Sequence, residues 1–530
     1  MAIDHVTEFK EDIQEFHKVT RQFYNGELTV PQYKSFSGGF GSYAQRGGER
    51  SMLRLRLAGG EINQDNLSFI VESIKKYHIS LVHLTTCQSV QLHNLTEETV
   101  CELIGEAFDH GIITRGGGGD FPRNVMCSPL SGVEQGEYLD VLPYAKEAAD
   151  YLLGFIKTVK LPRKLKVCFT NSDKDEVHAT FRDMGFVATK EHKFDVYIAG
   201  GLGIKPKMGV PVVKGLEPDQ ILYCIKSMVD VFTEHGNYQN RAASRSRFMQ
   251  DTLGVEGLQK AFQEKLEKNL EAGGLTINIQ ADKIEKNTQS IREISETCLV
   301  ENNRDVVVAN EKNTRLVPQK QTGLYAVAYH PVGGSPKPEF FGKLQQVIGD
   351  MKEVKIRITP DQGLYVINLT AEEAQKVLEV TKDGADTLFE TSSACIGASI
   401  CQVGIGDSQE MLKKCVERVR KEHFPDRVLP KIYISGCPSS CTGQQIGAIG
   451  FRGGKKPTPE GPKFSFAVYE NGCEYLGSER FGTDVGNMLV EDIPEFLVDL
   501  GKEVMSHGMI YDEYVKTYPD GLKQVAAKYL

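Results

Sequence analysis

The chain has 530 residues, of which 40% are hydrophobic and 25% are charged, and its formal net charge is −9. Such a length accommodates about three globular domains, and the acidic balance argues against nucleic acid as a partner. No apolar run reaches the roughly 18 residues that span a membrane. The first residues contain neither a basic region nor an apolar leader, so the 12 cysteines predict a reducing, cytoplasmic environment.

The first predicted elements occur twice along the chain. The first copy is a strand ending in Gly-Gly, a helix, a second strand and another helix, at residues 52–60, 64–77, 79–93 and from Thr96. The second copy follows about 270 residues later, at residues 325–334, 340–351, 354–359, 363–369 and from Thr370. Both threonines are suited to cap the helix that follows them. Two such units predict an α+β core with pseudo-twofold symmetry; the alternative is that unrelated α+β modules look alike.

Mixed α/β segments lie between and after the two copies. Buried strands are predicted at residues 165–170 and 194–201, and helices at 218–235 and 241–253. Polar residues 272–322 read as an irregular connector. Further strands are expected at residues 446–451 and 464–469, and an amphipathic helix at 490–500.

Four cysteines near the C-terminus form two close pairs. Cys395 and Cys401 have five residues between them, and Cys437 and Cys441 have three. Four thiolates on loops of small residues can close around an iron–sulfur cluster, whose irons prefer sulfur ligands. A structural zinc site is the first alternative, but zinc pairs usually have two to four intervening residues. Four unrelated buried thiols are the second alternative.

Three other segments precede the cysteines in a characteristic order. They are residues 84–93 (LTTCQSVQLH), 120–127 (DFPRNVMC) and 161–166 (LPRKLK). Together with the cysteine pairs, they resemble the sulfite/nitrite reductase hemoprotein family, from about residue 35 to the C-terminus. The resemblance implies sirohaem and a [4Fe–4S] cluster bound by Cys395, Cys401, Cys437 and Cys441. It also implies that the Cys441 thiolate is shared between the cluster and the sirohaem iron.

The basic motifs fit the reduction of a small oxyanion. Arg123 matches the anion-binding arginine of the family, and Lys164 and Lys166 match its two active-site lysines. The two lysines flank Leu165 at a predicted strand start, so both are expected to point to one face. Cationic side chains hold an anion and can supply protons to it. Nitrite reductases of this type have Asn at the second lysine position, so Lys166 favours sulfite. Without the resemblance, a solvated basic edge would be the ordinary interpretation of this segment.

One position departs from the family pattern. Residue 87 is Cys87, whereas the family has an arginine that contacts the anion. The loss of a charged hydrogen bond is expected to weaken anion binding by about 1.5–3 kcal/mol. Another base can compensate, and Arg115, in a run that continues with four glycines, is the candidate from sequence.

Further cationic and polar residues stand where the family contacts the carboxylates of the macrocycle. For each of them, a structural salt bridge is an equally reasonable interpretation. They are Arg54, Arg56, Gln88, Gln91, His93, Lys207, Asn240, Arg241 and Arg245, to which Arg115 is added.

The sequence therefore predicts an α+β, mixed α/β protein of three domains with a duplicated pair of ferredoxin-like half-domains. The expected domains are residues 1–105 with 318–385, residues 106–317 including a connector at 272–317, and residues 386–530. The expected activity is six-electron reduction of sulfite to sulfide, with reduction of nitrite to ammonia as the first alternative. A non-catalytic iron–sulfur carrier, or a zinc-stabilised scaffold, is the alternative from another class. Electrons are expected from a separate ferredoxin or flavoprotein subunit, and neither nucleic acid nor a membrane is expected as a partner.

Overall fold

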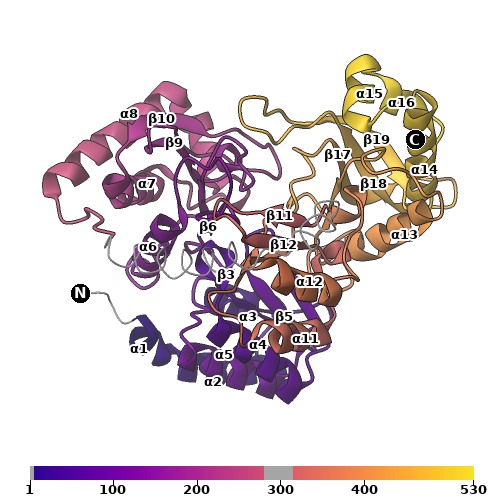
Figure 1. Cartoon of the computed structure of the whole chain (residues 1–530). Helices are drawn as coiled ribbons and strands as arrows, with labels where there is room; N and C mark the ends of the chain where they lie inside the picture. The colour runs from indigo at the N-terminus through magenta and orange to yellow at the C-terminus, as the bar shows by residue number, and fades with distance from the viewer. Residues whose placement is uncertain (1–4, 280–313) are drawn as a thin grey trace.

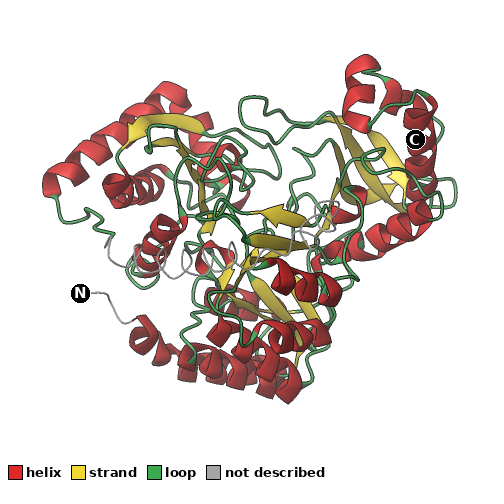
Figure 2. Ribbon diagram, viewed as in Figure 1, coloured by secondary structure: helices red, strands yellow, loops and turns green. Residues whose placement is uncertain are grey.

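The structure is a computed structural model that describes residues 5–279 and 314–530 (Figure 1). The described strands form four sheets, and most helices lie on the outside of the molecule (Figure 2). No helix in these two segments is both long and apolar enough to cross a membrane.

The first sheet has the strand order β1-β2-β5-β4. Its strands are β1 (Ser42–Ala44), β2 (Ser51–Leu55), β4 (Leu81–Leu84) and β5 (Val90–Leu95). Its helices are α4 (Gln64–Tyr77) and α5 (Glu97–Asp109), preceded along the chain by α1 (His5–Lys10), α2 (Asp12–Tyr24) and α3 (Val30–Ser37). Phe9 and Phe16 anchor the N-terminal helices because both are fully buried in the core that this sheet shares with the second sheet.

The second sheet has the order β11-β12-β14-β13-β3. It contains β11 (Leu316–Pro318), β12 (Tyr325–Tyr329), β13 (Lys355–Ile358) and β14 (Leu364–Leu369), with helices α11 (Pro338–Ile348) and α12 (Ala371–Val380). Its edge strand β3 (Glu61–Ile62) comes from the first copy and pairs with β13. The two copies therefore share one hydrophobic core, and neither copy is independent of the other.

The duplication is confirmed at the level of single residues. Asn94 and Asn368 both have left-handed backbone, with φ of 62° and 65°. The amide N–H of Asn94 donates to Gln45 Oε1 at 2.8 Å, and that of Asn368 donates to Gln319 Oε1 at 2.7 Å. The interval along the chain is the same for both pairs of equivalent residues, as repeated units require.

A pair of glutamines joins the duplicated sheets to the rest of the molecule. Gln88 donates to the carbonyls of Cys127 and Ile358, both at 2.8 Å, and accepts from the Cys127 N–H at 2.9 Å. Gln362 is its equivalent: it donates to the Ala394 carbonyl at 3.0 Å and accepts from the Ala394 N–H at 2.9 Å. Each glutamine thus pairs with the edge strand of one of the two remaining sheets.

Two glycines make room for these glutamines. A Cβ atom on Gly60 would lie 2.9 Å from Gln88 Cβ, and one on Gly334 would lie 2.6 Å from Gln362 Cβ. Both glycines also have positive φ, of 70° and 73°. The Gly-Gly ends of the two predicted strands are therefore required by close packing as well as by backbone conformation.

The third and fourth sheets share one topology. The third has the order β10-β9-β8-β7-β6, and the fourth has the order β15-β16-β17-β18-β19. In each, three strands pair in parallel and the next two pair antiparallel. The third consists of β6 (Met126–Cys127), β7 (Val167–Thr170), β8 (Met184–Ala188), β9 (Phe194–Ile198) and β10 (Val210–Leu216), with α6 (Leu142–Leu153), α7 (Ile221–His235) and α8 (Met249–Ala272).

The fourth sheet repeats this arrangement at the C-terminal end. It consists of β15 (Ser393–Ala394), β16 (Ile432–Ser435), β17 (Ile449–Lys456), β18 (Lys463–Glu470) and β19 (Thr483–Leu489), with α13 (Ser408–Arg420), α14 (Ile493–Ser506), α15 (Tyr511–Thr517) and α16 (Gly521–Ala526). The shared topology was not predicted from the sequence, because it resides in strand pairing.

Two predicted elements differ from the structure, and a third lies mostly outside the described residues. The strand expected at residues 79–93 is a hairpin, because residues 85–89 turn and Thr85 and Ser89 close the turn with a backbone hydrogen bond of 2.9 Å. The helix expected at 241–253 instead begins at Met249 and continues to Ala272. Most of the predicted connector, residues 280–313, lies outside the described residues.

The glutamine pair generates a stability prediction. Gln88→Ala leaves three buried backbone groups without partners, and each should cost about 1–3 kcal/mol. We expect a clearly lower urea midpoint for Gln88→Ala and for Gln362→Ala, measured by circular dichroism. Gln524→Ala is the control, since Gln524 is exposed on α16. A midpoint for Gln88→Ala equal to that of the control would contradict the proposed interlock.

Candidate active site

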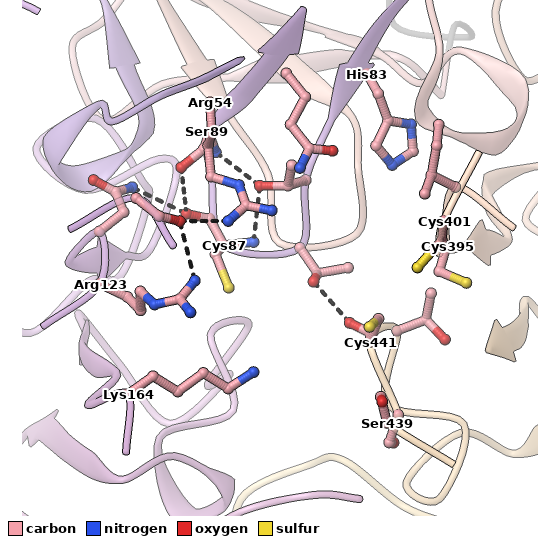
Figure 3. A pocket seen from close by; sticks show the side chains of 18 of the residues that line it. Arg54, His83, Cys87, Ser89, Arg123, Lys164, Cys395, Cys401, Ser439 and Cys441 are labelled. Carbon is pink, nitrogen blue, oxygen red and sulfur yellow. Dashed lines mark hydrogen bonds between the residues drawn. The ribbon is translucent and has the colours of Figure 1, made fainter. Parts of the chain in front are cut away.

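A cavity of about 370 Å³ lies where loops of all four sheets meet. This volume is in the range of small-molecule and cofactor sites. Arg54, Cys87 and Arg123 lie on one side of it, and the sulfur atoms of Cys395, Cys401 and Cys441 lie on the other (Figure 3).

The lining carries strong positive charge. Eight lysines and arginines contribute to it, and no aspartate or glutamate does: Lys34, Arg54, Arg56, Arg123, Lys164, Lys166, Arg182 and Arg245. Burial and the nearby Arg123 lower the pKa of Arg56 to about 9. Like charges buried together are costly unless an anion compensates them. The lining therefore indicates a ligand with several negative charges.

Buried polar atoms without partners support this conclusion. Nε of Arg123 and Nε of Arg245 are buried and form no hydrogen bond within the described residues. The other two nitrogens of Arg123 donate to the carbonyls of Gly117 and Gly119, at 3.0 and 2.7 Å. Arg123 is thus fixed by the glycine run, while part of its guanidinium is left for a ligand.

The glycine run is tightly packed rather than open. A Cβ on Gly118 would lie 2.5 Å from both the Gly38 carbonyl oxygen and the Tyr43 hydroxyl. The amide of Gly119 donates to that same hydroxyl at 2.7 Å. The glycine run is therefore a closely packed support for Arg123, because only glycine fits at Gly118.

The four C-terminal cysteines lie in the two loops that follow the carboxyl ends of β15 and β16 in the fourth sheet. Cys395 follows β15 and Cys437 follows β16, and these two strands are parallel. The Gly436 amide donates to Cys395 Sγ at 3.2 Å. Desolvation and the neighbouring thiols of Cys395, Cys437 and Cys401 together raise the pKa of Cys441 to about 12, and they outweigh the opposite effect of Lys164. All four are free thiols that are close enough to influence one another.

The arrangement of these thiols does not suit a single metal ion. Across residues 5–279 and 314–530, no three His, Cys, Asp or Glu side chains converge closely enough to hold one. Zinc would need all its sulfurs at about 2.3 Å from one point. A cluster of several irons, whose ligands are spread around its outside, is compatible with thiols that do not converge on one point.

Both lysines of the LPRKLK segment reach the cavity. Leu165, between them, is fully buried, so Lys164 and Lys166 share the opposite face. Burial lowers the pKa of Lys164 well below its usual value, and Arg245, Lys166 and Arg123 add to the effect by charge repulsion. Neither lysine pairs with a carboxylate among the described residues. Lys166 interacts with the Cys87 thiol instead, whereas the Lys164 amine is left for a ligand.

Cys87 also lines the cavity, within the turn between β4 and β5. Burial alone would raise its pKa, but the nearby Lys166 and Arg182 outweigh burial and lower it to about 6. Where the family pattern has an arginine, this chain therefore has a cysteine that is a thiolate near neutral pH.

Arg115 lies away from the cavity, contrary to the sequence prediction. Its Nε lies 3.2 Å from Asp12 Oδ2, and its Nη1 donates to the Gly39 carbonyl at 2.8 Å. Its guanidinium also stacks over Phe40, 4.2 Å from the ring centroid. Arg115 holds the N-terminal helices against the first sheet, and it does not replace the arginine missing at position 87.

The predicted cofactor contacts divide into two groups. The structure brings five to the cavity lining: Arg54, Arg56, Gln91, His93 and Arg245. Besides Arg115, four lie outside it: Gln88, Lys207, Asn240 and Arg241. Gln88 is fully buried in the glutamine interlock, whereas Lys207 pairs with Asp251 and Arg241 with Asp120. Asn240 caps a short 3-10 helix through the Ala242 amide.

The cavity also contains residues that the sequence interpretation missed. His178 and Arg182 line it from the segment between β7 and β8, and Lys34 and Tyr43 line it from the N-terminal region. The sequence contained a weak indication for Arg182, because this basic residue comes just before a buried strand, as Lys164 does. His178 has left-handed backbone, with φ of 58°, and nothing in the sequence around it predicts this conformation.

Comparisons with known proteins agree with this chemistry. A family described as "Nitrite and sulphite reductase 4Fe-4S domain" matches residues 118–270, and "Nitrite/Sulfite reductase ferredoxin-like half domain" matches residues 43–107. The first match contains Arg123, Lys164 and Lys166 but ends before the four cysteines.

Some relatives of the chain are named as nitrite reductases, and others are named as sulfite reductases. Ferredoxin–nitrite reductase of Arabidopsis thaliana is 24% identical over 82% of this chain and 71% of its own length. The sulfite reductase [NADPH] hemoprotein beta-component of Anoxybacillus flavithermus is 23% identical over 89% of this chain and 82% of its own. The solved structure of the Mycobacterium tuberculosis NirA protein has a TM-score of 0.75 at 19% identity and covers 97% of this chain and 95% of its own, which supports the same fold.

The acidic thiol of Cys87 can be tested by alkylation with iodoacetamide. We expect the rate at Cys87 to rise with a midpoint near pH 6, because the thiolate is the reactive form. Peptide mass spectrometry of the purified protein over a pH series measures it. Cys127 is the internal control, since burial raises its pKa to about 12. A Cys87 midpoint at the ordinary value of about 8.5 would show that Lys166 and Arg182 do not act on this thiol.

Proposed function

Because the chain belongs to the nitrite and sulfite reductase family, we propose that it reduces sulfite to sulfide in this cavity. Membership of this family implies sirohaem and a [4Fe–4S] cluster as cofactors. We further propose Cys395, Cys401, Cys437 and Cys441 as the cluster ligands, with the Cys441 thiolate shared with the sirohaem iron.

The observation that carries the proposal is the cavity lining of eight cations without a carboxylate. Sirohaem carries eight carboxylates, so its charge is complementary to this lining. The unpartnered Nε atoms of Arg123 and Arg245 offer donors to it or to a bound anion. The thiols on the opposite side supply the soft ligands that iron–sulfur clusters require. The residues present therefore fit both groups.

The cofactors, when bound, supply electrons and an open coordination position for the oxyanion. This chain's residues hold that anion: Arg123 as a fixed donor, and Lys164 and Lys166 as charges on the same side. We propose that Lys164, whose pKa is lowered by burial and by the cations around it, gives its proton to the bound oxyanion. Each oxygen of the substrate leaves as water only after protonation, so a proton donor at this place serves the reaction.

The cysteine side is held in position by a contact from the first sheet. The Thr86 hydroxyl donates to the Cys441 carbonyl at 2.8 Å. Thr86 precedes Cys87 in the same turn, so this turn contacts both sides of the cavity. We propose that it fixes the spacing between the proposed cluster ligands and the anion-binding side.

Nitrite is the second candidate substrate. Ferredoxin–nitrite reductases of several plants are among the relatives, and nitrite is also a small anion that takes up six electrons. We favour sulfite because Lys166 stands where the resemblance gives nitrite reductases an asparagine.

The electron donor is proposed to be a separate protein. One relative is named for ferredoxin, and another is named as a hemoprotein component of an NADPH sulfite reductase. We also propose the division of the chain into residues 1–105 with 318–385, 106–317 and 386–530. This division keeps each of the third and fourth sheets within one domain, although β11 (Leu316–Pro318) of the second sheet crosses the boundary after residue 317.

The function is tested by an absorption spectrum and by product analysis. The purified protein should show the Soret and red bands of sirohaem and should convert sulfite to sulfide with reduced methyl viologen as donor. Conversion of nitrite but not sulfite would select the second candidate. A cluster spectrum without haem bands would support an electron carrier, and a colourless protein would support a scaffold.

The ligand assignment predicts loss of the cluster in Cys395→Ser. Serine lacks the sulfur that the irons require, so iron and acid-labile sulfide should both fall to a small fraction of the parental content. Cys473→Ser is the matched control, since Cys473 is a half-buried free thiol of the C-terminal region that does not line the cavity. Parental iron content in Cys395→Ser would remove this residue from the ligand set.

The substrate preference predicts an asymmetric effect of Lys166→Asn. Removal of the ammonium should reduce kcat/KM for sulfite by about tenfold or more, equivalent to about 1.4 kcal/mol, and should affect nitrite much less. Steady-state rates with both anions and one artificial donor measure the ratio. Equal losses would show that Lys166 does not determine selectivity and would favour nitrite as substrate.

A further inference from the structure

We propose that Arg182 supplies the anion-binding guanidinium that the family pattern places at position 87, and that the buried pair His178 and Glu474 positions it. The inference rests on the proposed function, because it concerns the same oxyanion. It assigns a specificity-determining residue at a position that none of the recognised sequence motifs contains.

The location of Arg182 follows from strand pairing. β7 and β8 are parallel, with Val167 opposite Met184, so the same register continued backwards sets Lys166 opposite Asp183 and brings Arg182 opposite Leu165, one residue from Lys166. The Met184 amide donates to the Lys166 carbonyl at 3.1 Å, and the Lys166 amide donates to Asp183 Oδ2 at 3.0 Å. The side chains of Lys166 and Arg182 both line the cavity beside Cys87.

The guanidinium is held by its inner atoms and leaves one nitrogen for a ligand. Nε of Arg182 donates to the Val177 carbonyl at 2.9 Å, and Nη2 lies 3.4 Å from His178 Nδ1. Nη1 makes no hydrogen bond with any residue that the structure describes, and Arg182 forms no ion pair within those residues. Only 9% of the surface of Arg182 is exposed. The guanidinium is therefore a buried charge that faces the cavity and has no carboxylate partner among the described residues.

The support of Arg182 comes from another sheet. His178 Nε2 lies 2.9 Å from Glu474 Oε2, and Glu474 follows β18 of the fourth sheet. An arginine can only donate, so His178 Nδ1 accepts and Nε2 carries the hydrogen that Glu474 accepts. Glu474 is fixed in turn by the Tyr433 hydroxyl at 2.6 Å and by Lys431 at 3.0 Å. His178 and Glu474 are therefore positioning residues for Arg182.

Cys87 is consistent with this exchange of roles. A cysteine is smaller than an arginine, so Cys87 in the first sheet leaves space for a guanidinium that comes from the segment before β8 of the third sheet. The charged and titratable groups that act on the Cys87 thiol are Lys166, Arg182, Arg54, Arg123 and Cys168. Four of these are cations, so the thiol lies among the groups that would hold an oxyanion.

The test measures anion affinity rather than turnover. Sulfite is titrated against the haem absorbance of the purified holoenzyme, and nitrite is titrated in parallel. Arg182→Met should weaken sulfite binding by about 10- to 100-fold, as expected for loss of a charged hydrogen bond. The double variant Cys87→Arg/Arg182→Met should recover most of the affinity, because it returns the guanidinium to the family position.

Arg357→Met is the matched control. Arg357 is also buried, but it pairs with Glu61 in the second sheet and does not line the cavity. Its anion affinity should equal that of the parental protein. An Arg182→Met protein that binds sulfite as tightly as the control would overturn the inference, and so would a double variant no better than Arg182→Met.

Two further measurements keep the outcomes distinct. The pH midpoint of Cys87 alkylation should rise in Arg182→Met, because a cation that lowers the pKa of the thiol has been removed. The midpoint should not change in Arg357→Met. An unchanged midpoint in Arg182→Met would place Arg182 away from Cys87 and refute the inference. The parental protein is the reference for the proposed function. If neither anion perturbs its haem absorbance, the proposed function fails, and the inference fails with it.

Discussion

The fold depends on two buried glutamine side chains in strained turns. Gln88 and Gln362 have positive φ, of 53° and 74°, and each satisfies backbone groups of a neighbouring sheet. A buried amide that lost these partners would leave unpaired donors and acceptors at the centre of the molecule. The turns therefore have to form together with the sheets that they contact, and this couples the duplicated half-domains to both other sheets.

The same coupling creates the cavity. The hairpin turn at residues 85–89 contributes Gln88 to the interlock, Thr86 to the Cys441 carbonyl and Cys87 to the cavity lining. One short turn thus fixes the distance between two functional sides that lie far apart in sequence. A shift of this turn would change the stability of the fold and the geometry of the site at once.

Electrostatics divide the cavity into two unlike sides. Cys441 has neighbouring thiols and a pKa raised to about 12, whereas Cys87 has neighbouring cations and a pKa lowered to about 6. Burial raises the pKa of both, so the difference arises from the charges nearby. A side rich in thiols is suited to iron, and a side rich in cations is suited to a small oxyanion. Arg245 is paired with Asp183, but the other lining cations have no carboxylate partner among the described residues, so a bound polyanion stabilises the folded protein by removing their mutual repulsion.

The sequence alone determined the repeated strand–helix pattern and the cysteine pairs, because local periodicity and residue spacing carry that information. It also placed Arg123, Lys164 and Lys166 in segments that reach the cavity, since each lies in a distinctive motif. The tertiary structure decided the remaining site residues. Arg115 and Gln88 have the expected residue types, but an ion pair with Asp12 and the interlock with Cys127 take them away from the cavity.

Arg182 shows the opposite case. The parallel pairing of β7 and β8 brings Arg182 opposite Leu165, both it and Lys166 line the cavity, and its support by His178 depends on Glu474 from the fourth sheet. The shared topology of the third and fourth sheets was likewise visible only in strand pairing. Contacts between residues far apart in the chain leave no periodic trace in the sequence, so only the folded structure could reveal them.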